Sequence, residues 1–273
     1  MATVRSAAEF DEIAEVYDST REPLEPAVVD TIATTLRSWG VHSLLEVGVG
    51  TGRVGGPLGD RGFDVTGLDA SKRMLVRARA KGLSRLVLGS AYRLPFPDER
   101  FDAALFVHVL HVLEEPGPAL SEASRVAGLG VAALVRPPTA LEDTGPHGWS
   151  ARRLVIDSLR KDGVPVPDRA RGGPPVRERQ LLTQFPPDLL VTVSEEDVTE
   201  PLSHQLALFE QRASRWTLHV PPEKLARAVA EARLAVGDQT HTYHHVRALA
   251  WWARSSVAAG RFATTPAPPP SSG

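Results

Sequence analysis

The residues most able to do chemistry are three glycines at alternate positions, Gly48, Gly50 and Gly52, which follow the apolar run 43–47. Glycine lets the backbone turn sharply and lets a ligand approach it closely. The turn leads into a predicted helix, whose N-terminus offers N–H groups and the positive end of a dipole. A dinucleotide-binding turn would place glycine at position 53, where the sequence has Arg53. The turn therefore fits an amino-acid-like carboxylate better than a pyrophosphate.

An acidic residue stands where a ribose-binding carboxylate is expected. Asp69 ends the predicted strand 63–68 and lies 21 residues after Gly48. In parallel α/β sheets an acid at the tip of the second strand accepts hydrogen bonds from ribose hydroxyls. A glycine turn with a capping aspartate is the purely structural alternative. The turn, the acid and the strand order together predict a nucleoside-binding edge.

Two histidines, His108 and His111, follow the predicted strand 101–107. The carboxyl ends of parallel strands form the ligand cleft of such sheets, so both side chains are candidate general bases. The structural alternative is that His108 packs against a ligand and His111 belongs to the start of a helix. A pH–rate profile that stays unchanged in both His→Ala variants would exclude the base.

Three further histidines, His241, His244 and His245, have a spacing that a metal site could use. No paired acid is evident in the sequence around them, so we expect no metal site there. The sequence has no cysteine, which excludes disulfides, thiolate metal sites and a cysteine nucleophile.

Short apolar runs alternate with helical periodicity through the first half of the chain. Strands are expected at 43–47, 63–68, 85–88, 101–107 and 129–135, and helices at 51–59, 71–80 and 118–127. This alternation predicts an α/β fold with a Rossmann-like, doubly wound, mostly parallel sheet. Residues 9–38, before the first strand, have the pattern of two helices.

The pattern weakens after Arg136. Helices are expected at 149–160, 201–215 and 222–234, a loop or flap at 163–187 and a short strand at 189–193. Residues 240–251 alternate in part, which favours a late strand and leaves a helix open. We expect N-terminal cap helices in 1–40, a cofactor-binding core in 41–136, the rest of the sheet with substrate-cap insertions in 137–259, and a disordered tail in 260–273.

Composition narrows the possible partners. The 273 residues carry a formal net charge of −2, so no global positive field attracts nucleic acid. The N-terminus lacks a secretory signal, and no apolar run approaches the roughly 20 residues of a membrane helix. We therefore expect a cytoplasmic protein without a membrane partner, either a monomer or a homodimer.

Several segments together resemble the class I S-adenosylmethionine-dependent methyltransferases, and in particular their small-molecule, type 11 or quinone-methyltransferase-like branch. The matching segments are 10–18, 44–52, 67–71 with Met74, 89–91 with 94–96, 101–102 and 109–113. They lie within residues 10–136, about half of the chain. The resemblance implies a seven-stranded sheet with N-terminal helices and a helical cap, and methyl transfer by in-line displacement.

The resemblance also implies which residues contact S-adenosylmethionine. The implied contacts are Glu46, Gly48, Gly50, Thr51 and His108 at the methionine end, Asp69 at the ribose, and Ala70, Met74, Ser90 and Ala91 around the adenine. Tyr17 is expected to fold over the cofactor and Arg21 to meet its carboxylate. The family commonly has an acid at the Ser90 position, so adenine contact is expected to be weaker here.

Other functions remain open at the level of sequence. A nicotinamide-dependent oxidoreductase is one, although Arg53 argues against it, and a non-catalytic cofactor-binding module is another. The absence of cysteine excludes covalent methylation of pyrimidine C5, and no Asn/Asp-Pro-Pro-Tyr/Phe segment follows the fourth strand. Both features favour a small-molecule acceptor over DNA, while an RNA acceptor stays possible.

Overall fold

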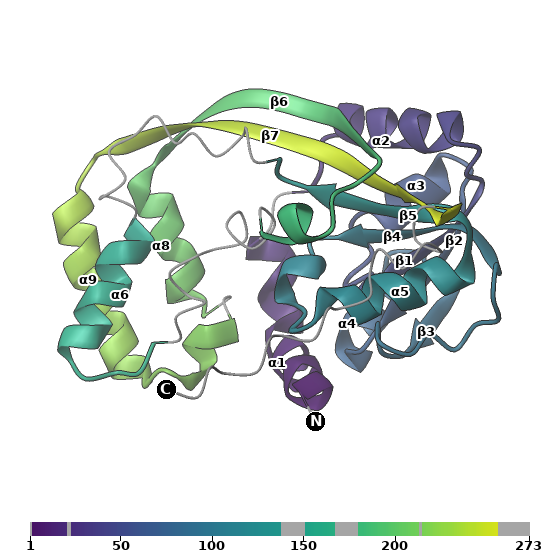
Figure 1. Cartoon of the computed structure of the whole chain (residues 1–273). Coiled ribbons are helices and arrows are strands. Elements are labelled where there is room, and N and C mark those ends of the chain that lie inside the picture. Colours follow the sequence, from purple (N-terminus) through teal and green to yellow (C-terminus); the bar gives the residue numbers. More distant parts are fainter. Residues whose placement is uncertain (1, 21–22, 138–150, 167–179, 213–214, 256–273) are drawn as a thin grey trace, which may run out of the picture.

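The computed structural model describes residues 2–20, 23–137, 151–166, 180–212 and 215–255. Its centre is a seven-stranded sheet in the order β3-β2-β1-β4-β5-β7-β6 (Figure 1). The strands are β1 (Ser43–Val47), β2 (Asp64–Asp69), β3 (Leu86–Leu88), β4 (Phe101–Val107), β5 (Ala127–Val135), β6 (Leu189–Pro201) and β7 (Thr240–Ala253). The first five pair in parallel, and β7 joins β5 and β6 antiparallel. The predicted Rossmann-like, mostly parallel sheet is confirmed.

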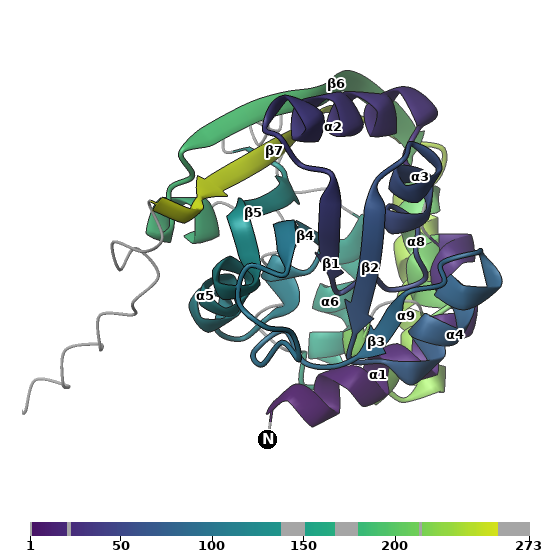
Figure 2. The ribbon, with the colours of Figure 1, turned by 90° about the vertical axis from the view of Figure 1, so that its right-hand side faces the viewer.

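Helices cover both faces of the sheet, because its central strands are apolar on both sides. The helices are α1 (Ala2–Tyr17), α2 (Pro26–Ser38), α3 (Gly55–Asp60), α4 (Lys72–Ala80), α5 (Pro116–Val126), α6 (Ala151–Lys161), α8 (Leu202–Glu210) and α9 (Pro222–Val236). Figure 2 shows α2 and α3 over one face and α5 over the other. Leu44 and Leu105 belong to the core under α2, and Leu45 and Phe106 to the core under α5.

Most elements of the first half agree with the sequence pattern. β1 and β4 have the predicted bounds, and Ser71 caps α4 by accepting a hydrogen bond from the Met74 amide. α3 is shorter than the predicted helix 51–59, because the glycine turn occupies its first residues. None of the helices in the described ranges has the length and apolar character that a bilayer crossing requires.

The second half differs more. β6 extends to Pro201 instead of ending at residue 193, and residues 180–184 of the predicted loop are helical. Residues 240–251 form the strand β7 and not a helix. The predicted tail 260–273 and most of the predicted flap lie outside the described residues.

β6 and β7 form a long ribbon that reaches beyond the sheet. β5 pairs with residues 248–253 of β7, while residues 240–247 pair with β6 alone. In Figure 1 the far end of this ribbon leads to α6, α8 and α9, which lie away from the sheet. These helices share an apolar core that includes Leu159, Leu206 and Ala228. We call α6, α8, α9 and the short helix η4 (Arg215–His219) the cap.

α1 lies between the sheet and the cap. It contacts α4 on one side and η4 on the other. Ile13 and Ala14 of α1 form one cluster with Met74 of α4, and Leu218 of η4 packs against it. The N-terminal helix therefore connects the sheet to the cap.

Candidate functional site

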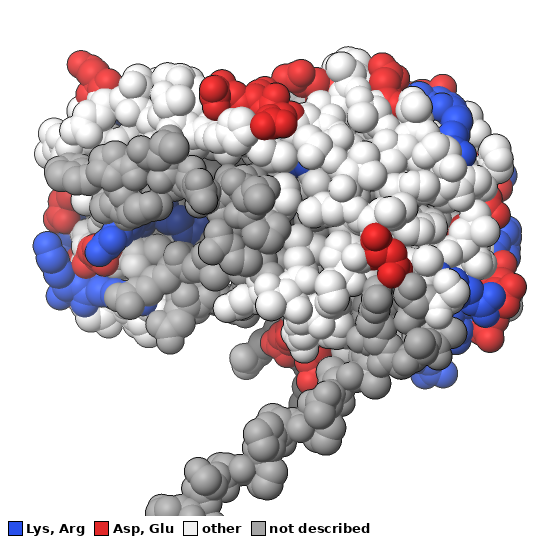
Figure 3. All heavy atoms as spheres, turned by 45° about the horizontal axis from the view of Figure 1, so that its top comes forward, with Lys and Arg blue, Asp and Glu red and all other residues white. Residues whose placement is uncertain are grey.

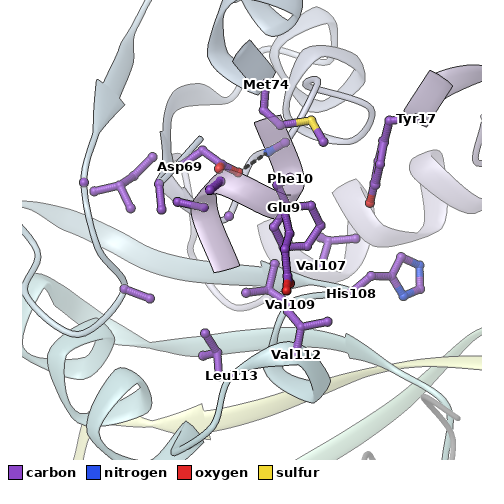
Figure 4. Close-up of a pocket in the computed structure, with 18 of the residues that line it drawn as sticks. Glu9, Phe10, Tyr17, Asp69, Met74, Val107, His108, Val109, Val112 and Leu113 are labelled. Carbon is purple, nitrogen blue, oxygen red and sulfur yellow. Dashed lines mark hydrogen bonds between the residues drawn. The ribbon is translucent and has the colours of Figure 1, made fainter. Parts of the chain in front are cut away.

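A cavity of about 940 Å³ opens at the carboxyl ends of β1, β2 and β4, under α1 (Figure 4). Its lining comes from the glycine turn, the tip of β2, the segment after β4, the helix α1 and the cap. The predicted site residues among its lining are Tyr17, Gly48, Gly50, Asp69, Ala70, Met74, Ala91 and His108. The fold therefore brings eight of the predicted residues to one cavity.

The glycine turn has the backbone conformation that its residue types favour. Gly48 has a φ of +77° and Gly50 a φ of +55°, both in the left-handed region. A side chain at position 48 would collide with Val109, whereas a Cβ at position 50 would meet nothing within 4 Å. Because these glycines have no side chains, the backbone of the turn is accessible from the cavity and a ligand can approach it closely.

Asp69 joins two turns of the site. Its Oδ2 accepts a hydrogen bond of 2.8 Å from the Gly50 amide, and its Oδ1 accepts one of 2.8 Å from the Ser71 amide. Burial raises the pKa of Asp69, and the amides that donate to it oppose this shift. Because the carboxylate lines the cavity, it is both a structural tie and an acceptor for ligand hydroxyls.

Glu46 lies beneath the glycine turn and is only 2% exposed. The Gly55 amide donates to its carboxylate, and Oε2 has no hydrogen-bond partner among the described residues. Burial raises the pKa of Glu46 to about 8, and the nearby charge of Asp69 adds to this effect. The carboxyl is therefore protonated and uncharged at neutral pH, and a positively charged group placed at the turn would lower its pKa again.

We expect Glu46→Gln to remove a pH dependence of stability. Between pH 4.5 and about 8 the folded protein retains a proton on Glu46 that the unfolded chain has released. The unfolded state then binds fewer protons, so this carboxyl makes the free energy of unfolding fall by about 1.4 kcal/mol per pH unit in that window. Urea unfolding at pH 5 and pH 8 should show a smaller decrease for the variant than for the wild type. Equal decreases would contradict the buried, protonated state.

Two aspartates hold α1 over the site. Asp11 accepts hydrogen bonds from Ser71 Oγ at 2.5 Å and from the Arg73 amide at 2.9 Å, at the start of α4. Asp18, in the short helix η1 (Asp18–Thr20), accepts one from Thr51 Oγ1 at 2.5 Å and pairs with Lys81 Nζ at 2.7 Å. Burial tends to raise the pKa of Asp18, but the bonds from Lys81 and Thr51 outweigh it and lower the pKa.

Asp18→Ala should weaken binding of S-adenosylhomocysteine about tenfold. Asp18 follows Tyr17, which lines the cavity, and its bond to Thr51 ties this end of α1 to the glycine turn. A charge-assisted hydrogen bond contributes about 1.5–3 kcal/mol, and water replaces part of that contribution in the variant. Glu15→Gln is the matched control, since Glu15 lies on α1 and pairs with exposed Arg73 away from the cavity. Calorimetry that gives both variants the wild-type Kd would overturn this role.

The candidate bases occupy different positions. His108 lines the cavity with an exposed side chain, and its φ of +54° is unusual for a residue with a Cβ. His111 belongs to the short helix η2 (Leu110–Val112) and does not line the cavity. Their catalytic roles remain predictions, and the geometry favours His108 of the two.

The other predicted contacts lie close behind the cavity wall or outside the described residues. Thr51 is buried and bonded to Asp18, and Ser90 Oγ accepts a hydrogen bond from the Tyr92 amide at 3.2 Å. Arg21 lies outside the described residues. Sequence reasoning missed Glu9 and His219, which also line the cavity and come from α1 and the cap. Neither residue belongs to a motif, so no local signal identified them.

Ser90→Asp should tighten binding of the adenosine group several-fold. Ser90 follows Gly89, which lines the cavity, and an aspartate there adds a charged acceptor for an adenine amino group. Calorimetry with S-adenosylhomocysteine measures the gain, and Ser90→Asn, which has the same size without the charge, is the control. An unchanged Kd in the aspartate variant would refute the expectation.

The histidines of β7 have acidic neighbours in the fold, which the sequence around them did not reveal. His244 Nδ1 lies 2.8 Å from Asp197 Oδ1, and its Nε2 lies 3.0 Å from Glu195 Oε1. Both acids come from β6, which the sequence pattern ended too early. The hydrogen bonds to Asp197 and Glu195 raise the pKa of His244. Over the described ranges, no three His, Asp or Glu side chains are grouped so that they could hold a metal ion.

Comparison with known proteins agrees with this geometry. Residues 45–133 match the family model described as "Methyltransferase domain". Demethylmenaquinone methyltransferase of Renibacterium salmoninarum is 35% identical over 133 residues, which are 45% of this chain and 54% of that protein. The chain spans about half the length of the first curated relatives it matches.

Two further similarities extend over more of the chain. An uncharacterized methyltransferase of Mycobacterium tuberculosis is 26% identical over 246 residues, covering 88% of this chain and 84% of that protein. The YcgJ structure from Bacillus subtilis has a TM-score of 0.49 at 16% identity and covers 82% of this chain and 97% of that one. The matched segment, residues 45–133, contains the glycine turn, Asp69 and His108, and this part of the chain is similar to methyltransferase domains.

Proposed function

We propose that this protein transfers a methyl group from S-adenosylmethionine to a small-molecule acceptor. The observation that carries the proposal is the cavity, whose lining combines eight predicted cofactor contacts with further residues of α1 and with His219 of the cap. Its volume of about 940 Å³ is near the upper end of the range for small-molecule sites. In this proposal residues 41–136 bind the cofactor, and α1 and the cap enclose the acceptor.

The described residues fit the cofactor. Asp69 offers a carboxylate to the ribose hydroxyls, and Ala70, Met74 and Ala91 give an apolar surface for the adenine. Glu46, buried beneath the glycine turn with an unsatisfied oxygen, offers a carboxyl group that can hydrogen-bond at the methionine end. When bound, the cofactor supplies an electrophilic methyl group on a sulfonium. The residues of the chain then position the acceptor in line and exclude water, which accounts for most of such catalysis.

Surface charge supports a small acceptor over a nucleic acid. On the face in Figure 3, acidic side chains gather along one margin and basic ones lie toward the sides, without one broad basic patch. The whole chain has a formal net charge of −2. Nucleic-acid binding draws most of its affinity from Lys and Arg spread over a broad surface, and the basic side chains visible on this face are confined to its sides.

The proposal is tested first by binding and then by turnover. S-adenosylmethionine and S-adenosylhomocysteine should each raise the melting temperature in a concentration-dependent way, and NAD should not. Isotope-labelled S-adenosylmethionine should then label at least one compound in a panel of phenols, hydroquinones and amines. Stabilisation by NAD alone would favour an oxidoreductase. Labelling of bulk RNA without any labelled small molecule would overturn the choice of acceptor.

A further inference from the structure

Glu9 and His219 meet at the cavity, and neither has a role in the site described above. Glu9 Oε1 lies 3.0 Å from His219 Nε2. Glu9 belongs to α1 and His219 is the last residue of η4, and both residues line the cavity. In Figure 4 the Glu9 side chain extends toward Val109, in the segment that follows β4. The fold thus joins a carboxylate and an imidazole from opposite ends of the chain.

The surroundings hold this pair in place. The Glu9 side chain is only 14% exposed, whereas that of His219 is 67% exposed. Leu218, the residue before His219, packs against the cluster that contains Ile13 and Ala14 of α1. Arg212 donates to the carbonyl oxygens of Thr217, Leu218 and Val220, which fixes η4 from the other side. The carboxylate is therefore positioned by α1, and the imidazole keeps one side open.

We infer that Glu9 and His219 act as a general-base pair on the acceptor, an inference that rests on the proposed methyl-transfer function. When Nε2–H donates to Glu9, the lone pair of the neutral imidazole lies on Nδ1. A carboxylate in this position selects the tautomer and stabilises the imidazolium that forms after proton transfer. His219 takes the proton, and Glu9 acts through His219 as a positioning residue.

This assignment indicates the class of acceptor. A base is needed only if the nucleophile binds with its proton, as a phenol or an enol does. The apolar side chains of Phe10, Val112 and Leu113 line the same cavity and suit the body of such a molecule. The acceptor proton moves to His219 Nδ1 while the acceptor oxygen bonds to the methyl carbon. The carbon–sulfur bond breaks with its electron pair on sulfur, and the proton leaves to solvent from the exposed side of His219.

The test uses 4-nitrophenol, whose ionised form absorbs at longer wavelength than its neutral form. The probe is titrated into the S-adenosylhomocysteine complex of the full chain, at a pH below the pKa of the free phenol. We expect the bound probe to be largely ionised in the wild type, several-fold less so in Glu9→Gln, and neutral in His219→Gln. Glu15→Gln and His204→Gln are matched controls, because these residues lie on α1 and in the cap without lining the cavity.

The outcomes separate this inference from the proposed function. A neutral bound probe in the wild type, an equally ionised probe in His219→Gln, or no binding of the probe would each overturn the base pair. Unchanged affinity for S-adenosylhomocysteine in the variants shows that they are folded. If the bound probe is ionised but the protein methylates no compound, the Glu9–His219 inference stands and the proposed methyl-transfer function is refuted. If His219→Gln methylates its acceptor at the wild-type rate, the Glu9–His219 inference is refuted and the proposed methyl-transfer function stands.

Discussion

Asp69→Ala should weaken binding of S-adenosylhomocysteine by at least about 100-fold, the largest functional effect that we expect from a single substitution. Two charge-assisted hydrogen bonds to ribose hydroxyls are worth about 3–6 kcal/mol together, and 1.4 kcal/mol corresponds to a factor of ten. The same substitution also leaves the amides of Gly50 and Ser71 without the acceptor that now joins their turns. Calorimetry with S-adenosylhomocysteine measures the loss directly.

Two further variants make this result specific. Asp69→Asn keeps one oxygen acceptor and should lose less affinity than Asp69→Ala. Asp64→Ala is the matched control, because Asp64 begins the same strand at its opposite end and pairs with Arg85 at the surface. A Kd for Asp69→Ala within threefold of the wild-type value would show that the ribose is bound elsewhere.

Trp252→Ala should lower the free energy of unfolding by about 3–5 kcal/mol, the range measured for removing a large aromatic side chain from a core. Trp252 is fully buried, and its Nε1 donates a hydrogen bond of 3.0 Å to the Phe185 carbonyl oxygen. The substitution opens a cavity and removes this hydrogen bond. Urea unfolding, followed by fluorescence or circular dichroism, measures the change.

Trp252→Ala should reduce the stability of the fold without changing the affinity for the cofactor product. Trp252 pairs with Val131 in the middle of β5, and neither residue lines the cavity, so folded Trp252→Ala should bind S-adenosylhomocysteine with the wild-type Kd. Leu234→Ala, on the surface of α9 at 86% exposure, should change the free energy of unfolding by less than about 0.5 kcal/mol. A similar loss in both variants would contradict the burial described for Trp252.

The cofactor end of the site could be predicted because its residues are close together in the sequence. The run 43–47, the glycines after it and Asp69 form one strand–turn–helix–strand unit, whose conformation follows from local residue types. Ser71 caps its helix through a bond to Met74, three residues further on, which is also a local effect. The contacts of these residues with a ligand stayed a prediction, because the direction in which a side chain points depends on the elements packed around it.

The part of the cavity that we propose for the acceptor depends on contacts between segments far apart in the sequence. Glu9 and His219 are 210 residues apart, and nothing in either local sequence indicates that they meet. β6 was predicted too short because its second half is polar on its exposed face and is stabilised by pairing with β7. The same pairing brings Glu195 and Asp197 to His244.

The sequence by itself determined the first five strands of the sheet, the glycine turn and the position of Asp69, since periodicity and turn chemistry are local properties of the chain. Only the tertiary structure decided that α1 bridges the core to the cap, that Glu46 lies buried with an unsatisfied oxygen, and that a histidine of the cap meets a glutamate of α1. The physical reason is that burial and pairing of these side chains are set by packing between elements far apart in sequence, which no local pattern encodes.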